Sequence, residues 1–164
     1  MLFRFVALLC LATLSLDTYC QIDITFPVSR IVFQRDLNNE ADVEVAGNFT
    51  TICDQIDAKL SPLQGFPGNS TDWQKIVDNP KNGIYKGQIK AKGGWYNLEV
   101  RATLKGKVVA YTTLQRVGVG EVFIAAGQSN AEGSLDYPGS EKGSNDDRIN
   151  VIDYKDIFME ESKL

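Results

Sequence analysis

Ser129 is the residue of this chain that is best placed to act as a nucleophile. It stands in the run Gly127-Gln128-Ser129-Asn130, directly after an almost unbroken apolar run over residues 119–126. A short apolar run bounded by glycines is typical of a strand buried on both faces of a parallel sheet. Ligands bind just past the carboxyl ends of such strands. The sequence therefore places the Ser129 hydroxyl where it could attack a substrate, with the following backbone N–H groups facing an anion.

A purely structural role is the alternative for Ser129. Serine and asparagine are both favoured in turns and at helix N-caps, and such dipeptides occur in many loops. The preceding apolar run and the Gly127-Gln128 pair favour the nucleophile instead. The pattern predicts no role for Asn130 or Glu132.

The same segment resembles a known family. Gly127-Gln128-Ser129-Asn130, preceded by Gly120-Glu121-Val122 and a hydrophobic strand, is similar to the first motif of the sialate O-acetylesterase-like carbohydrate esterases. That family belongs to the SGNH hydrolase superfamily, which has a flavodoxin-like α/β fold. The resemblance implies that Ser129 accepts the acyl group, that its backbone N–H contributes to the oxyanion hole, and that the substrate is an acetylated sugar or glycan. It implies no metal and no organic cofactor.

The segment is not a lipase-type nucleophile elbow, and the chain also departs from the family pattern. Ala131 replaces the last glycine of the lipase-type nucleophile elbow. The family further requires a later glycine and asparagine for the oxyanion hole and a downstream Asp-x-x-His, whereas this chain contains no histidine. A serine without a general base is a poor nucleophile at neutral pH. We therefore expect an incomplete, inactive N-terminal fragment of a carbohydrate O-acetylesterase. The alternative is a non-catalytic secreted module for carbohydrate binding or domain contact, in which the Ser129 region is a vestige.

The N-terminal residues 1–20 read as a secretory signal peptide. Arg4 provides the positive start, residues 5–16 form an apolar core, and Thr18 and Cys20 are small residues at positions −3 and −1 of a cleavage site. The apolar core is shorter than the roughly 20 residues that a membrane-spanning helix needs. We expect a secreted or periplasmic protein that is free of the membrane after cleavage. A lipoprotein anchored through Cys20 is the competing interpretation.

Charge and cysteine content exclude several other functions. The net charge is −4, so we expect no nucleic-acid partner. Cleavage after Cys20 would leave Cys53 as the only cysteine, and one cysteine cannot form an internal disulfide. No histidine is present to activate the Cys53 thiol, so we expect a small buried or edge-strand residue there. Oligomeric state is not predicted.

Residues 21–117 predict an immunoglobulin-like β-sandwich, and residues 118–164 the start of the truncated hydrolase domain. Period-two alternation of polar and apolar residues, separated by Gly- and Asn-containing turns, indicates about seven strands with one wet face. Tyr96 is expected to be buried, with its hydroxyl bonded to backbone a few residues upstream. Trp95 falls on the other face, partly exposed or against a neighbouring domain. Trp73, in a long connection over residues 61–81, is expected to anchor a loop, with sugar stacking as the alternative. The alternating runs cover residues 31–34, 41–46, 52–60, 85–92, 96–104 and 108–114.

Overall fold

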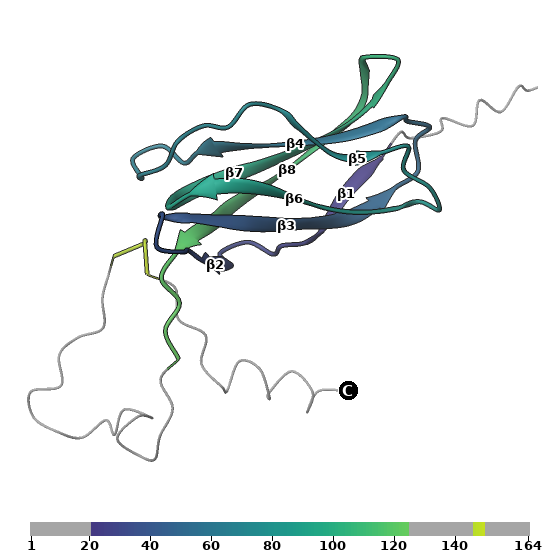
Figure 1. The fold of residues 1–164 in the computed structure, drawn as a ribbon. Helices are drawn as coiled ribbons and strands as arrows, with labels where there is room; N and C mark the ends of the chain where they lie inside the picture. Colours follow the sequence, from purple (N-terminus) through teal and green to yellow (C-terminus); the bar gives the residue numbers. More distant parts are fainter. Residues whose placement is uncertain (1–20, 125–145, 150–164) are drawn as a thin grey trace, which may run out of the picture.

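Alternation of polar and apolar residues produces two packed β-sheets, as the computed structural model shows (Figure 1). The structure describes residues 21–124 and 146–149. The predicted signal peptide and the motif residues Gly127, Gln128, Ser129 and Asn130 lie outside the described residues. The strands are β1 (Ile22–Phe26), β2 (Val32–Gln34), β3 (Glu40–Phe49), β4 (Gln55–Pro62), β5 (Gln74–Asp78), β6 (Ile84–Lys92), β7 (Gly94–Leu104) and β8 (Lys107–Gly120).

The two sheets differ in size and in strand direction. One has the order β1-β3-β6 and is antiparallel throughout. The other has the order β2-β8-β7-β4-β5, in which β2 runs parallel to β8 and every other pair is antiparallel. The chain leaves the sandwich at the end of β8, beside β2 (Figure 1). This end is therefore where any following domain begins.

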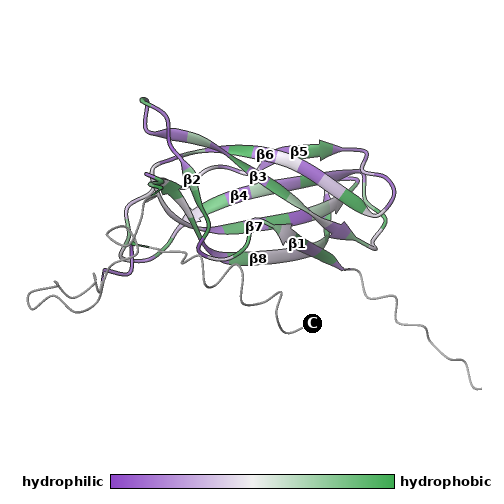
Figure 2. Cartoon of the chain, turned by 90° about the horizontal axis from the view of Figure 1, so that it is seen from below, coloured by the Kyte–Doolittle hydropathy of each residue, from purple (hydrophilic) through white to green (hydrophobic). Residues whose placement is uncertain are grey.

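The core lies between the two sheets and consists of the apolar residues that alternate with polar ones along each strand and face inward. Figure 2 shows hydrophobic and hydrophilic residues alternating along the strands. Burying the apolar half of each strand is the main driving force for this packing. The mostly β prediction, and the sandwich itself, are confirmed. Fully buried core residues include Val43, Val45, Ile56, Leu60, Tyr96, Leu98, Val100 and Val117.

A β-bulge near the end of β8 shifts the alternation by one residue. Leu114 pairs with Leu98 and Val117 pairs with Tyr96, so two residues of β8 lie opposite Asn97. Arg116, in this bulge, has a left-handed φ of 62°. An extra residue reverses which side chains face the core. Val117 and Val119 therefore point inward, and Val119 is only 4% exposed.

Two expectations from the sequence fall at or just after this bulge. The sequence predicts that the hydrolase domain starts at residue 118, and β8 continues through that position to Gly120. The predicted buried strand over residues 119–126 is not formed in its described part. Its first two residues complete β8, residues 121–124 have no regular structure, and Phe123 and Ile124 are 87% and 90% exposed. A doubly buried strand needs covering layers on both faces, and the described residues provide none.

Three smaller expectations also differ from the structure. The strand predicted to begin at residue 52 begins at Gln55, and Ile52 is 80% exposed. The connection over residues 61–81 contains the edge strand β5, whose polar sequence hides the alternation. Trp95 is 6% exposed rather than partly exposed, because it packs against Gly118 of its own sheet, where a Cβ would lie 3.1 Å from the ring.

Candidate functional site

The chain that leads into the predicted Ser129 motif is fixed to the sandwich at Glu121. One carboxylate oxygen of Glu121 accepts a hydrogen bond from Arg35 Nε at 2.8 Å, and the other accepts from Gln34 Nε2 at 2.8 Å. Gln34 Oε1 also accepts from the backbone N–H of Val122 at 2.7 Å. The hydrogen bonds from Gln34 and Arg35 hold the pKa of Glu121 below its usual value. The backbone therefore leaves β8 in a defined direction.

A second attachment joins the same end of the sandwich to Asp147. Its two carboxylate oxygens bind different guanidinium groups, Arg30 at 2.7 Å and Arg116 at 2.5 Å. The hydrogen bonds from Arg30 and Arg116 lower the pKa of Asp147. The Arg116 guanidinium also lies 5.5 Å from the centre of the Phe66 ring, within cation–π range.

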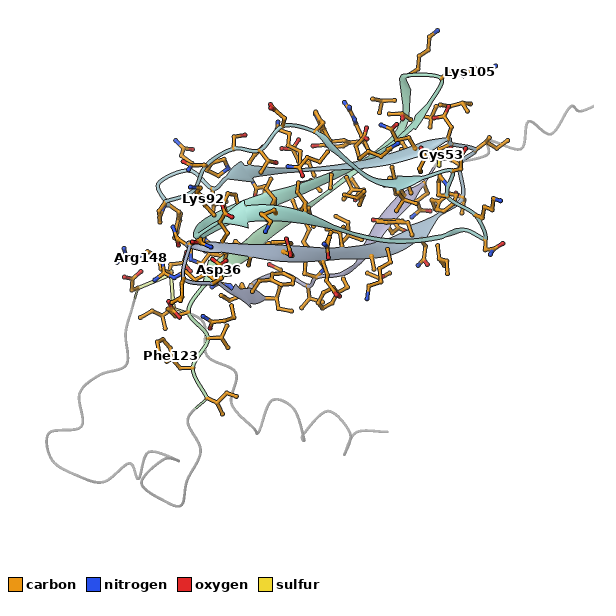
Figure 3. The ribbon with its side chains drawn as sticks, viewed as in Figure 1. Asp36, Cys53, Lys92, Lys105, Phe123 and Arg148 are labelled. Carbon is orange, nitrogen blue, oxygen red and sulfur yellow. The ribbon has the colours of Figure 1, made fainter. Side chains whose placement is uncertain are left out.

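These two attachments flank residues 125–145, which contain Ser129. Figure 3 shows Phe123 and Arg148 at the end of the sandwich opposite Lys105. Neither attachment was predicted, because no short motif links an arginine in a turn or a bulge to an acidic residue far along the chain. The one available signal is the block of polar and charged residues that follows the apolar run over 31–33.

Tyr96 forms the predicted tyrosine corner. Its ring is fully buried, and its hydroxyl donates a hydrogen bond to the Lys92 carbonyl at 2.7 Å. The same hydroxyl accepts one from the Asn69 N–H at 3.3 Å. The hydroxyl thus joins the β6–β7 turn to the β4–β5 loop, so Tyr96 has a structural role.

Trp73 is held by charged residues on the outer face of the five-stranded sheet. The Arg101 guanidinium lies 4.2 Å from the ring centre, and Tyr111 makes an edge contact at 6.4 Å. Arg101 is in turn fixed by a 2.9 Å bond from its Nε to Asp57, which is only 2% exposed. One face of the indole is therefore covered, and a sugar ring could not stack on it. These contacts agree with the anchoring role, and they concern only one face of the ring.

A shallow cavity of about 390 Å³ opens beside this cluster. It is lined by several polar groups, but its acidic residues are already engaged. Asp57 binds Arg101, Asp54 accepts from the Lys105 N–H at 2.7 Å, and Asp78 binds Lys75 at 3.0 Å. Within residues 21–124 and 146–149, no group of His, Cys, Asp and Glu is arranged to hold a metal ion. The lining residues are Asp54, Gln55, Asp57, Asp78, Asn79, Arg101, Thr103 and Gly106.

Cys53 is partly buried, and its surroundings disfavour the thiolate form. Burial raises the pKa of the Cys53 thiol, and the negative charge of Asp54 raises it further. The thiolate is the reactive form, so both effects lower the reactivity at neutral pH. Cys53 lies before β4 rather than in a strand, and it packs partly buried against the core, so the expected structural role is borne out in part.

No helix of the described residues is long and apolar enough to cross a membrane. No protein-family model matches the chain, and no curated protein matches it. A functional assignment therefore has to rest on the residues themselves.

Proposed function

We propose that this chain is the N-terminal part of a secreted carbohydrate O-acetylesterase similar to the sialate O-acetylesterases. The observation that carries the proposal is the run Gly127-Gln128-Ser129-Asn130, which follows a glycine-bounded apolar segment. Ser129 is the proposed nucleophile. The described part of the chain would serve as the domain that precedes the hydrolase.

We further propose that the preceding domain is immunoglobulin-like. Its strand order, β1-β3-β6 against β2-β8-β7-β4-β5, matches a sandwich in which the first strand divides between the two sheets. The pairing of β2 with the last strand β8 is parallel, as that division requires. Tyr96 on the penultimate strand has the hydrogen bond of a tyrosine corner.

In the proposed reaction, the Ser129 hydroxyl attacks the carbonyl carbon of a sugar acetate. A general base supplied by the remainder of the protein takes the hydroxyl proton. The negative charge that develops on the carbonyl oxygen is stabilised by backbone N–H groups, including that of Ser129. The C–O bond to the sugar then breaks, and the sugar hydroxyl leaves with a proton. Water attacks the acetyl-serine and releases acetate, which restores the hydroxyl.

The second candidate is a non-catalytic module that contacts another domain. The two attachments at Glu121 and Asp147 favour it, because they show one end of the sandwich engaged with the following chain. The genomic sequence after Leu164 separates the two candidates. An open reading frame with an Asp-x-x-His motif supports the esterase, whereas a stop codon supports the module.

The activity test uses p-nitrophenyl acetate with this chain and with the full-length protein. This chain should show no hydrolysis above a Ser129→Ala control, since a general base alone contributes roughly 10²–10⁴-fold. In the full-length protein, Ser129→Ala should abolish deacetylation, and a serine-directed organophosphate should label Ser129 alone. Activity in the full-length protein that survives Ser129→Ala would refute the family assignment.

A further inference from the structure

We propose that the end of the sandwich bearing Arg30, Gln34, Arg35 and Arg116 is a docking surface for the chain's own continuation. It would hold the two ends of segment 125–145 through Glu121 and Asp147. The docking does not depend on esterase chemistry. Ser129 lies between the two attachments in the sequence. Any effect of the docking on catalysis by Ser129 rests on the proposed function.

The first attachment is made rigid by the sheet beneath it. β2 and β8 run parallel, with Gln34 opposite Gly120. The backbone N–H of Arg35 donates to the Gly120 carbonyl at 2.9 Å. The side chains of Gln34 and Arg35 thus begin at the point where the chain leaves the sheet. Both oxygens of Glu121 are engaged, which restricts the direction of the residues that follow.

In the second attachment, two arginine side chains bind one carboxylate. The Arg30 N–H donates to the Arg116 carbonyl at 2.6 Å, so the backbones carrying the two guanidinium groups are held together. Two like charges at such a place repel each other, and a carboxylate between them removes the repulsion. Asp147 gives one oxygen to each arginine. Arg116 is the left-handed residue of the β8 bulge. The bulge therefore does more than increase the local twist, because it also carries one of the two arginines that bind Asp147.

Exposed apolar residues accompany these charged contacts. Phe123 and Ile124 are almost fully exposed, and Val28, in the turn that carries Arg30, is 60% exposed. Exposed side chains of this size would gain free energy from burial against a neighbouring part of the chain. Interfaces between domains of one chain combine polar and apolar contacts. Asp147 shows which partner uses this end: the continuation of the same chain.

The main alternative is that these ion pairs are ordinary surface contacts that restrain nothing. Exposed pairs often contribute little to stability, and the side chains of Arg30, Arg116 and Asp147 are 41%, 29% and 45% exposed. A test must therefore measure whether residues near 147 are held, rather than whether the sandwich is more stable.

Limited trypsin digestion of the mature chain provides that test. A protease binds its substrate in an extended conformation, so cleavage after Arg148 should be faster when its segment detaches, and under mild digestion the rate follows the detached population. Arg30→Gln and Arg116→Gln should each raise the rate of cleavage after Arg148 by about 1.5- to fivefold, as expected for loss of a modest ion pair. Neither substitution alters the sequence around the cleaved bond. Lys107→Gln is the matched control, because it removes the same charge from the opposite end of β8.

Arg35→Gln tests the first attachment in the same way. It should raise chymotrypsin cleavage after Phe123 by about 1.5- to fivefold, with Lys107→Gln again unchanged. Cleavage after Lys59, inside β4, must stay slow in every variant. If Arg116→Gln speeds cleavage after Lys59, that substitution has loosened the sandwich itself. The test then rests on Arg30→Gln, because Arg30 lies in a turn outside the strands. Unchanged cleavage after Arg148, or an equal rise in the Lys107→Gln control, would overturn the docking surface while leaving the esterase proposal standing.

Discussion

Replacing Tyr96 by phenylalanine isolates one hydrogen-bonding group in the centre of the fold. The ring stays in place, so no cavity forms, and only the hydroxyl is lost. That hydroxyl donates to the Lys92 carbonyl at 2.7 Å, a full-strength geometry, and accepts from the Asn69 N–H at 3.3 Å, which is long for a hydrogen bond. One such bond contributes about 0.5–1.5 kcal/mol net. The weaker bond adds a fraction of that, and both freed backbone groups belong to exposed residues that water can reach.

We therefore expect Tyr96→Phe to lower the free energy of unfolding by about 1–2 kcal/mol. For a domain of this size, urea midpoints should fall by roughly 0.5–1 M, with an unchanged slope. Tyr111→Phe is the matched control, because its hydroxyl bonds to Glu99 on the exposed face and its residue is 53% exposed. That variant should change stability by less than about 0.5 kcal/mol. A midpoint for Tyr96→Phe equal to that of the wild type, or equal to that of Tyr111→Phe, would refute the structural role.

Two further predictions concern the three-stranded sheet. Gly47→Ala should lower the free energy of unfolding by more than about 3 kcal/mol, because the new Cβ would lie 1.8 Å from the Asp23 carbonyl oxygen. Gly120→Ala, whose Cβ would lie 3.6 Å from Val32, should be tolerated in the same denaturation assay. Burial, followed by the charge of Asp23, raises the pKa of Tyr85 above its ordinary value of 10.0. The unfolded chain then releases this proton first, so the free energy of unfolding should fall above about pH 10 by up to 1.4 kcal/mol per pH unit. Tyr85→Phe should flatten that fall, and an unaltered slope would contradict the assignment.

Much of the sandwich could be predicted because its strands follow the period of two. The alternating residues of β3, β6 and β7 face the core as expected, and Tyr96 makes its bond to upstream backbone. The local pattern did not predict elements that depend on pairing between two segments distant in sequence. β5 is an edge strand with mostly polar residues, and it forms because β4 offers an unpaired edge.

The candidate site divides in the same way. The apolar run, the Gly127-Gln128-Ser129-Asn130 motif and its resemblance to an esterase family point to Ser129 as the proposed nucleophile, and the absence of histidine removes the usual base from this chain. The sequence could not show that Glu121 and Asp147 attach to one end of the sandwich. Those contacts join residues separated by 31 to 117 positions, and no local preference encodes them.

The sequence by itself determined which residues are strand-forming, which face the core, and which short run could carry a nucleophile. Those properties depend on each residue and its near neighbours, and water imposes them wherever a strand has one wet face. Tertiary structure decided where β8 ends and which charges meet. The pattern breaks at Arg116 whether the cause is a domain boundary or a bulge, and only pairing with β7 shows that it is a bulge. The same bulge brings Arg116 beside Arg30, because strand pairing fixes the position of both backbones.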